Sequence, residues 1–100
     1  MKVVLVNPPN NYDDSFELAP PLGLLSLASA LADEAVDVVI LDFNLRSIAD
    51  HDFVDRDFYA RALREIAAEG PDVVGLTSMV VNSHVALELA RRLRAEDRDV

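Results

Sequence analysis

The stretch that decides the fold lies at the start of the chain: Val3-Val4-Leu5-Val6-Asn7-Pro8-Pro9. A short, continuous apolar run bounded by turn residues is typical of a strand that is buried on both faces. The two prolines must end that strand, because proline offers no backbone N–H for pairing and fixes φ. The sequence therefore predicts a buried strand over residues 2–6, followed at once by a loop.

A second proline pair, Pro20-Pro21, closes that loop and opens a helix, because a missing N–H costs nothing in the first helical turn. The connection from Asn7 to Pro21 is long for a strand-to-helix loop in a compact domain. Loops of this length are usually functional or disordered. In an open α/β sheet such a loop lies at the carboxyl end of its strand, where ligands bind.

The rest of the chain alternates between helical and strand-like patterns. After helix 22–33 we expect strand 36–41, which ends at Asp42, and then a polar stretch over 44–57. A second helix begins near Asp57 and is stopped by Gly70-Pro71. Strand 72–76 follows, and a third helix begins at Asn82 or Ser83. The residues expected to face the core are Leu24, Leu27, Ala28 and Leu31, with Leu25 and Ala32 widening the stripe; Tyr59, Leu63, Ile66 and Ala67; and Ala86, Leu89, Ala90 and Leu93.

This order predicts an α/β fold: a flavodoxin-like or Rossmann-like parallel sheet with helices on both faces and strand order 2-1-3. The sequence at Arg98-Asp99-Val100 looks like the approach to a fourth strand, so we expect the fold to be truncated after the third βα unit. The alternative is a complete three-stranded protein. In the truncated case the third strand is an exposed apolar edge, and we expect self-association through it.

Composition limits the class of function. The chain has 100 residues, of which 51% are hydrophobic, and its net charge is −9. That charge excludes a nucleic-acid backbone as the expected partner. No apolar stretch is long enough to span a bilayer, so no membrane association is expected. The absence of cysteine rules out disulfides and thiolate chemistry within the chain and makes a cytoplasmic location the default expectation.

Several familiar sites do not fit. A dinucleotide site needs glycines between the first strand and helix, but the only glycine there is Gly23, already inside the helix. A phosphoacceptor aspartate is missing, because the third strand ends Leu76-Thr77-Ser78. Asp42 can bond a ribose or another polar ligand group, or it can simply end its strand.

Hydroxyl and histidine side chains leave further alternatives open. Thr77 and Ser78 can hydrogen-bond a ligand beside their strand, or they can cap the next helix. His84 can face the same crevice or lie on the surface. His51 stands among aspartates that can bind a metal, or it can belong to an acidic loop. We assign no catalytic residue and no metal ligand.

Three segments together resemble a known family: 2–9, the Pro20-Pro21-Leu22-Gly23-Leu24-Leu25 run, and Pro71-Asp72-Val73-Val74-Gly75-Leu76-Thr77-Ser78-Met79. They are similar to the N-terminal cobalamin-binding domain of cobalamin-dependent radical S-adenosylmethionine enzymes, of which the anaerobic Mg-protoporphyrin monomethyl ester cyclase group is one branch. The resemblance covers nearly the whole chain, so residues 1–100 are expected to be a partial cobalamin-binding domain. Strands four and five and the radical domain would lie outside it.

The resemblance implies a set of cobalamin contacts. Asn7, Pro8 and Pro9 would face the cobalt side of the corrin. Pro21, Leu22 and Gly23 would line the ring, and Thr77, Ser78 and Met79 would line the slot for the nucleotide tail. Other cobalamin proteins carry Asp-x-His-x-x-Gly after the first strand, with the histidine bound to cobalt. Pro9 stands where that histidine would fall, so no histidine ligand is expected from this loop.

The expected function is a cobalamin-binding module of a radical S-adenosylmethionine enzyme that carries out methyl transfer or related radical chemistry. The chain alone would not be an enzyme, and S-adenosylmethionine and a 4Fe-4S cluster would be bound by the parent protein outside it. The alternative is a non-catalytic Rossmann-like interaction or sensor domain that has lost cobalamin binding.

Overall fold

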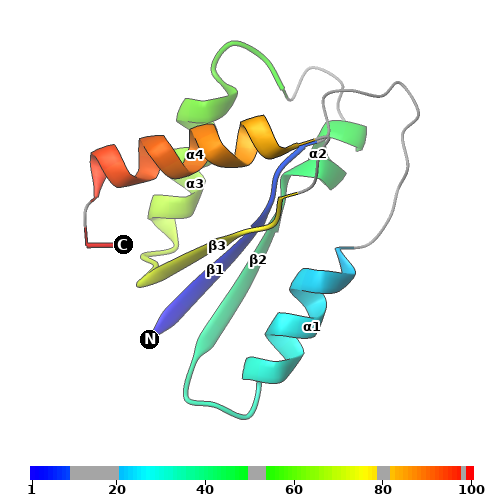
Figure 1. Ribbon diagram of the computed structural model, residues 1–100, viewed down its shortest axis with the longest axis vertical. Coiled ribbons are helices and arrows are strands. Elements are labelled where there is room, and N and C mark those ends of the chain that lie inside the picture. The colour runs from blue at the N-terminus through cyan, green and yellow to red at the C-terminus, as the bar shows by residue number, and fades with distance from the viewer. Residues whose placement is uncertain (10–20, 50–53, 79–81, 98) are drawn as a thin grey trace.

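The computed structural model describes residues 1–9, 21–49, 54–78, 82–97 and 99–100, and its centre is a three-stranded parallel sheet (Figure 1). The strands are β1 (Lys2–Asn7), β2 (Asp37–Asp42) and β3 (Val73–Leu76), in the order β2-β1-β3. Both pairs are parallel, with Val3 opposite Val38 on one side and Val73 on the other. The predicted flavodoxin-like fold class and strand order are confirmed.

Strand β1 divides the hydrophobic core into two parts, because successive side chains of a strand point to opposite faces. On one face Val4 and Val6 belong to a large cluster with side chains of α2 (Phe43–Ala49), α3 (Phe58–Ala68) and α4 (Ser83–Glu96). On the other face Val3 and Leu5 meet only Leu24 of α1 (Leu22–Leu31) among the fully buried side chains. Within the part of the chain that the structure describes, one face is thus well covered, and the other carries α1 (Figure 1).

The short helix α2 was not predicted, because its residues from 44 onward were expected to belong to a polar stretch without a helix. Phe43 begins α2 and is completely buried, with its ring edge-on to that of Phe58 at 5.8 Å between centroids. A single buried aromatic residue in a polar segment produces no helical periodicity. The sequence pattern therefore could not indicate the helix.

Several alanines and leucines expected to face the core are exposed. In α1 only Leu24 is fully buried, while Leu27 is 52% exposed and Leu25 45%. This helix is apolar on nearly every side, so its pattern does not mark one buried face. The other residues whose predicted burial is wrong are Ala32, Ala67 and Ala90. Alanine favours helices whether or not it is buried, which makes it a poor indicator of the core.

Helices α3 and α4 are joined at the surface by charged and aromatic groups. The Arg92 guanidinium lies over the Tyr59 ring, 4.5 Å from its centroid, and its Nε donates to Glu88 Oε1 (2.8 Å). Hydrogen bonds from Arg91 and Arg92 lower the pKa of Glu88 to about 2.

In the described part of the chain, no helix is long and apolar enough to cross a membrane.

The smaller hydrophobic cluster, formed by Val3, Leu5 and Leu24, should leave no room for a side chain at position 75. A Cβ at Gly75 would lie 2.8 Å from Leu5 Cδ2, and Leu5 is buried. We expect Gly75→Ala to lower the free energy of unfolding by about 1 kcal/mol, because overpacking outweighs the lower backbone entropy of alanine. Urea unfolding followed by circular dichroism measures this. Gly23→Ala is the control: apart from its chain neighbours and its own helix backbone, nothing lies within 4 Å of a Cβ there, and alanine favours a helix, so this variant should not lose stability. Equal stability of Gly75→Ala and the unchanged chain would contradict the prediction.

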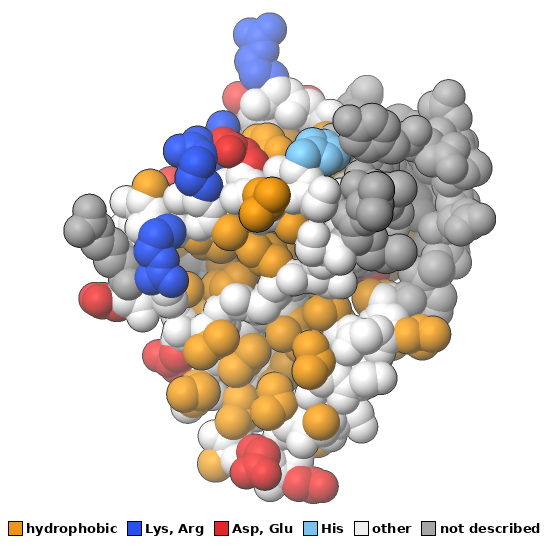
Figure 2. All heavy atoms as spheres, in the orientation of Figure 1, with side chains coloured by type: hydrophobic (Ala, Val, Ile, Leu, Met, Phe, Trp, Pro, Cys, Tyr) orange, Lys and Arg blue, Asp and Glu red, His pale blue; other side chains and the backbone are white. Residues whose placement is uncertain are grey.

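Self-association through β3 stays a prediction. In the described sheet β3 has a strand neighbour on one edge only, and Val73 is 44% exposed. Figure 2 shows hydrophobic side chains gathered on this face of the molecule, below α4 and beside α1.

Light scattering of the 100-residue chain should give a mass above that of a monomer at high protein concentration. Val73→Lys should shift the mass toward the monomer, because an edge lysine opposes strand pairing. Leu27→Lys adds the same charge at an exposed apolar position of α1 and should leave the mass unchanged. A monomeric mass for the unaltered chain would count against edge pairing.

Candidate functional site

The carboxyl ends of the three strands meet at one edge of the sheet. Asn7 lies opposite Asp42 in the β1–β2 register, and Val6 lies opposite Leu76 in the β1–β3 register. The strand ends that carry Asn7, Asp42 and Thr77 are therefore brought to the same edge (Figure 1). This is the edge at which open α/β sheets bind their ligands.

The three residues that end β1 and follow it, Asn7, Pro8 and Pro9, are held by burial and by a hydrogen bond. Pro8 and Pro9 are both fully buried, whereas prolines are usually exposed. Asn7 is half-buried, and its Nδ2 donates to Asp42 Oδ1 across the strand ends (3.0 Å). These residues therefore have a defined position at the end of β1, beside the candidate site.

The start of α1 forms an open apolar ledge. Pro21 is half-buried, and its carbonyl oxygen accepts the first helical hydrogen bond from the Leu25 N–H (3.0 Å). Leu22 is 68% exposed, and nothing lies within 4 Å of where a Gly23 Cβ would be. An exposed leucine beside a bare backbone provides room for a flat apolar ligand.

The third strand contributes two hydroxyl groups to the edge. The Thr77 N–H donates to the Val6 carbonyl oxygen (3.1 Å), so pairing with β1 continues one residue past β3. Thr77 is half-buried and Ser78 is exposed. Met79, the last predicted contact, lies outside the described residues, as does His51. His84 is exposed in the first turn of α4.

Asp42 has a clear structural role. Its Oδ1 accepts both the Asn7 side-chain N–H and the Leu45 backbone N–H, each at 3.0 Å. The second bond caps α2, since Leu45 is the third residue of that helix. This geometry favours the alternative in which Asp42 ends its strand, and a ligand contact by Asp42 stays a prediction.

Asn82 belongs to the same edge, and sequence reasoning placed it only near a helix start. Its side chain is buried, and its Nδ2 donates to the Pro8 carbonyl oxygen (3.4 Å). Asparagine before a helix is ordinarily read as a cap. No sequence signal could have indicated a partner 74 positions away.

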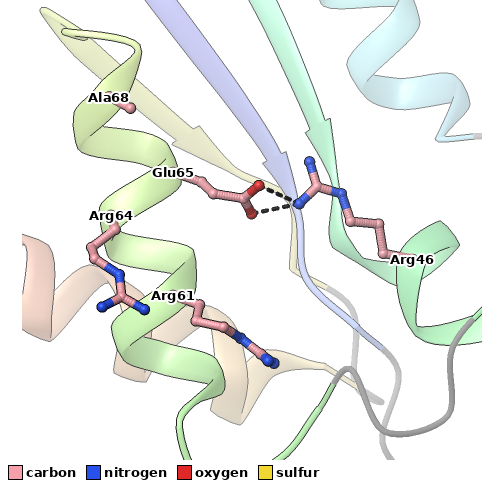
Figure 3. Close-up of a pocket in the computed structure, with 5 residues that line it drawn as sticks. All are labelled: Arg46, Arg61, Arg64, Glu65 and Ala68. Carbon is pink, nitrogen blue, oxygen red and sulfur yellow. Dashed lines mark hydrogen bonds and ion pairs between the residues drawn. The ribbon is translucent and has the colours of Figure 1, made fainter.

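Two cavities lie away from this edge. The larger, about 370 Å³, lies between α2 and α3, where Arg46 forms an ion pair with Glu65 (Figure 3). The other, about 240 Å³, lies between β3 and α4. Neither is lined by a residue of the predicted cobalamin site. In the part of the chain that the structure describes, no group of three or more His, Asp or Glu side chains could hold a metal ion.

The fold and the site geometry agree with the comparison to known families. A family model for the B12 binding domain matches residues 14–100, which is most of the chain. This chain therefore belongs to the B12-binding domain family, and the family resemblance predicted from its sequence is confirmed.

One curated relative adds detail. The anaerobic magnesium-protoporphyrin IX monomethyl ester cyclase of Synechocystis sp. (strain ATCC 27184 / PCC 6803 / Kazusa) is 37% identical over 59 residues. The match covers 56% of this chain and only 12% of that protein. No solved structure matches the chain significantly.

The two hydrogen bonds that Asp42 accepts should contribute measurably to the free energy of unfolding. Asp42→Ala removes the cap of α2 and the acceptor for Asn7, so we expect the free energy of unfolding to fall by about 2 kcal/mol. Asp42→Asn keeps a side-chain oxygen at the same place and should cost less than about 0.5 kcal/mol. Urea unfolding of both variants checks this, and an equal loss in the two would show that the negative charge matters rather than the acceptor.

Proposed function

We propose that the carboxyl edge of this sheet binds cobalamin for a larger radical S-adenosylmethionine enzyme. The observation that carries the proposal is that Asn7, Asp42 and the end of β3, after which Thr77 and Ser78 follow, meet at one sheet edge in a chain of the B12-binding domain family. When bound, cobalamin supplies the methyl-transfer or radical chemistry of such an enzyme. The residues of this chain bind and orient it.

The described residues fit a corrin in their chemistry. The ledge at Leu22 and Gly23 offers apolar surface and open backbone for a flat ring. The Thr77 and Ser78 hydroxyls can donate hydrogen bonds to the polar groups of a nucleotide tail. An apolar surface with a few well-placed polar groups is the usual composition of a cofactor site.

We propose that the first loop offers no histidine ligand to cobalt. Proline nitrogen within a peptide bond has no lone pair to donate, and Asn7 directs its side-chain N–H to Asp42. The buried Pro8-Pro9 pair would shield the lower face of the ring instead. Cobalt should then carry water or no ligand on that side.

We further propose that the domain continues in a longer protein. The outer edge of β3 has no strand neighbour in the described sheet, and the matched relative is far longer than this chain. Strands four and five would extend the sheet beyond β3. Binding sites for S-adenosylmethionine and a 4Fe-4S cluster would lie in the remainder, because this chain contains no cysteine to hold a cluster.

Titration with hydroxocobalamin, followed by visible absorption, tests the binding surface. Leu22→Asp should weaken binding about tenfold, because a charge replaces apolar contact with the ring. Leu87→Asp is the matched control: Leu87 is 71% exposed in α4 and lies outside the proposed site, so affinity should not change. Equal affinities of the two variants would contradict the proposed surface. No binding by the unaltered chain or by the longer protein would favour a non-catalytic interaction or sensor domain.

The axial ligand is tested by electron spin resonance of the bound, reduced Co(II) state. We expect no nitrogen superhyperfine splitting, because neither the dimethylbenzimidazole tail nor a histidine would lie on cobalt. A nitrogen splitting would refute this part of the proposal while leaving cobalamin binding intact.

A further inference from the structure

Asn82 occupies the cap position before the first residue of α4, but it has two features that a simple helix cap does not have. It is 1% exposed, and its side chain makes no capping hydrogen bond. An asparagine at this position normally accepts an N–H from the first turn of its own helix. Here the Nδ2 donates to the Pro8 carbonyl oxygen instead, across the carboxyl edge of the sheet.

The first loop needs such a donor. Pro8 and Pro9 provide no N–H, so this segment cannot be fixed by backbone donors of its own. Its carbonyl oxygens are the groups that can be held, and a buried carbonyl must find a donor. Asn82 is the side chain that reaches Pro8 from the far side of the edge.

The loop is thus held from two sides. Asn7 ties its beginning to Asp42 at the end of β2, and Asn82 ties Pro8 to the start of α4. These two bonds connect all three strand–helix junctions of the sheet. A loop fixed in this way loses little freedom when a ligand settles on it, which favours binding.

We infer that Asn82 is a positioning residue, which holds Pro8 and, through it, the end of β1 at which the candidate cobalamin site begins. This inference rests on the proposed function and adds to it a residue outside the predicted contacts. Asn82 acts through Pro8.

The sharpest test is Asn82→Asp. Aspartate has the same shape and is an equally good residue to precede a helix, but it replaces the Nδ2 donor with an oxygen that repels the Pro8 carbonyl. Asn44→Asp is the matched control, because it introduces the same charge at another buried asparagine, in α2. We expect the dissociation constant for hydroxocobalamin to rise about tenfold for Asn82→Asp and to change less than about twofold for Asn44→Asp, with similar helicity in both.

A second measurement needs no cobalamin. The ¹³Cβ and ¹³Cγ chemical shifts of Pro8 and Pro9 should change in Asn82→Asp and stay unchanged in Asn44→Asp. If neither the unaltered chain nor the longer protein binds cobalamin, the proposed function fails, and these shifts still decide whether Asn82 holds Pro8. Should Asn82→Asp fail to fold, Asn82→Ser keeps a capping hydroxyl but is too short to reach Pro8, and the same results are expected. Unchanged proline shifts, or an unchanged affinity in a folded variant, would overturn the inference.

Discussion

Strand β1 is the constraint on which the rest of the structure depends. It has a parallel neighbour on each edge and a hydrophobic cluster on each face, so all of its backbone and side-chain groups are committed. Val4 and Val6 point to one face of the sheet and Val3 and Leu5 to the other. One strand therefore supplies central side chains to both hydrophobic clusters. The two prolines that follow cannot continue the strand pairing, so β1 ends there. The candidate site therefore begins where the buried strand ends.

The carboxyl edge obtains its order from side chains rather than from backbone pairing. Prolines there cannot donate, and the bonds that replace the ladder come from Asn7 and Asn82, which reach to opposite sides. Two buried prolines and two asparagine bonds make a wall that does not depend on any ligand for its shape.

The sequence analysis predicted the sheet well because its signals are local. A continuous apolar run, a Pro-Pro end and the Gly70-Pro71 stop each specify an element without knowledge of the others, and Gly70 does take the left-handed conformation, with φ of 62°. Helix α2 was missed because only Phe43 marks it, and the exposed leucines of α1 were misjudged because the helix is apolar all round. The location of the candidate site could be predicted from the strand ends. The Asn7–Asp42 and Asn82–Pro8 hydrogen bonds could not, because the sequence around each asparagine does not specify its distant partner.

The unequal cores have a consequence for how a cofactor would act on this protein. Among the described residues, α1 is the helix that covers its face of the sheet, and Leu24 is its one fully buried side chain. The same helix begins with the ledge at Leu22 and Gly23. A segment with so few buried contacts should open at low free-energy cost. A flat apolar molecule lying between that ledge and the ends of β1 and β3 would bury the leucines that the protein leaves uncovered. The ligand would then serve as an interior part of the domain, and its binding energy would appear directly as stability of α1.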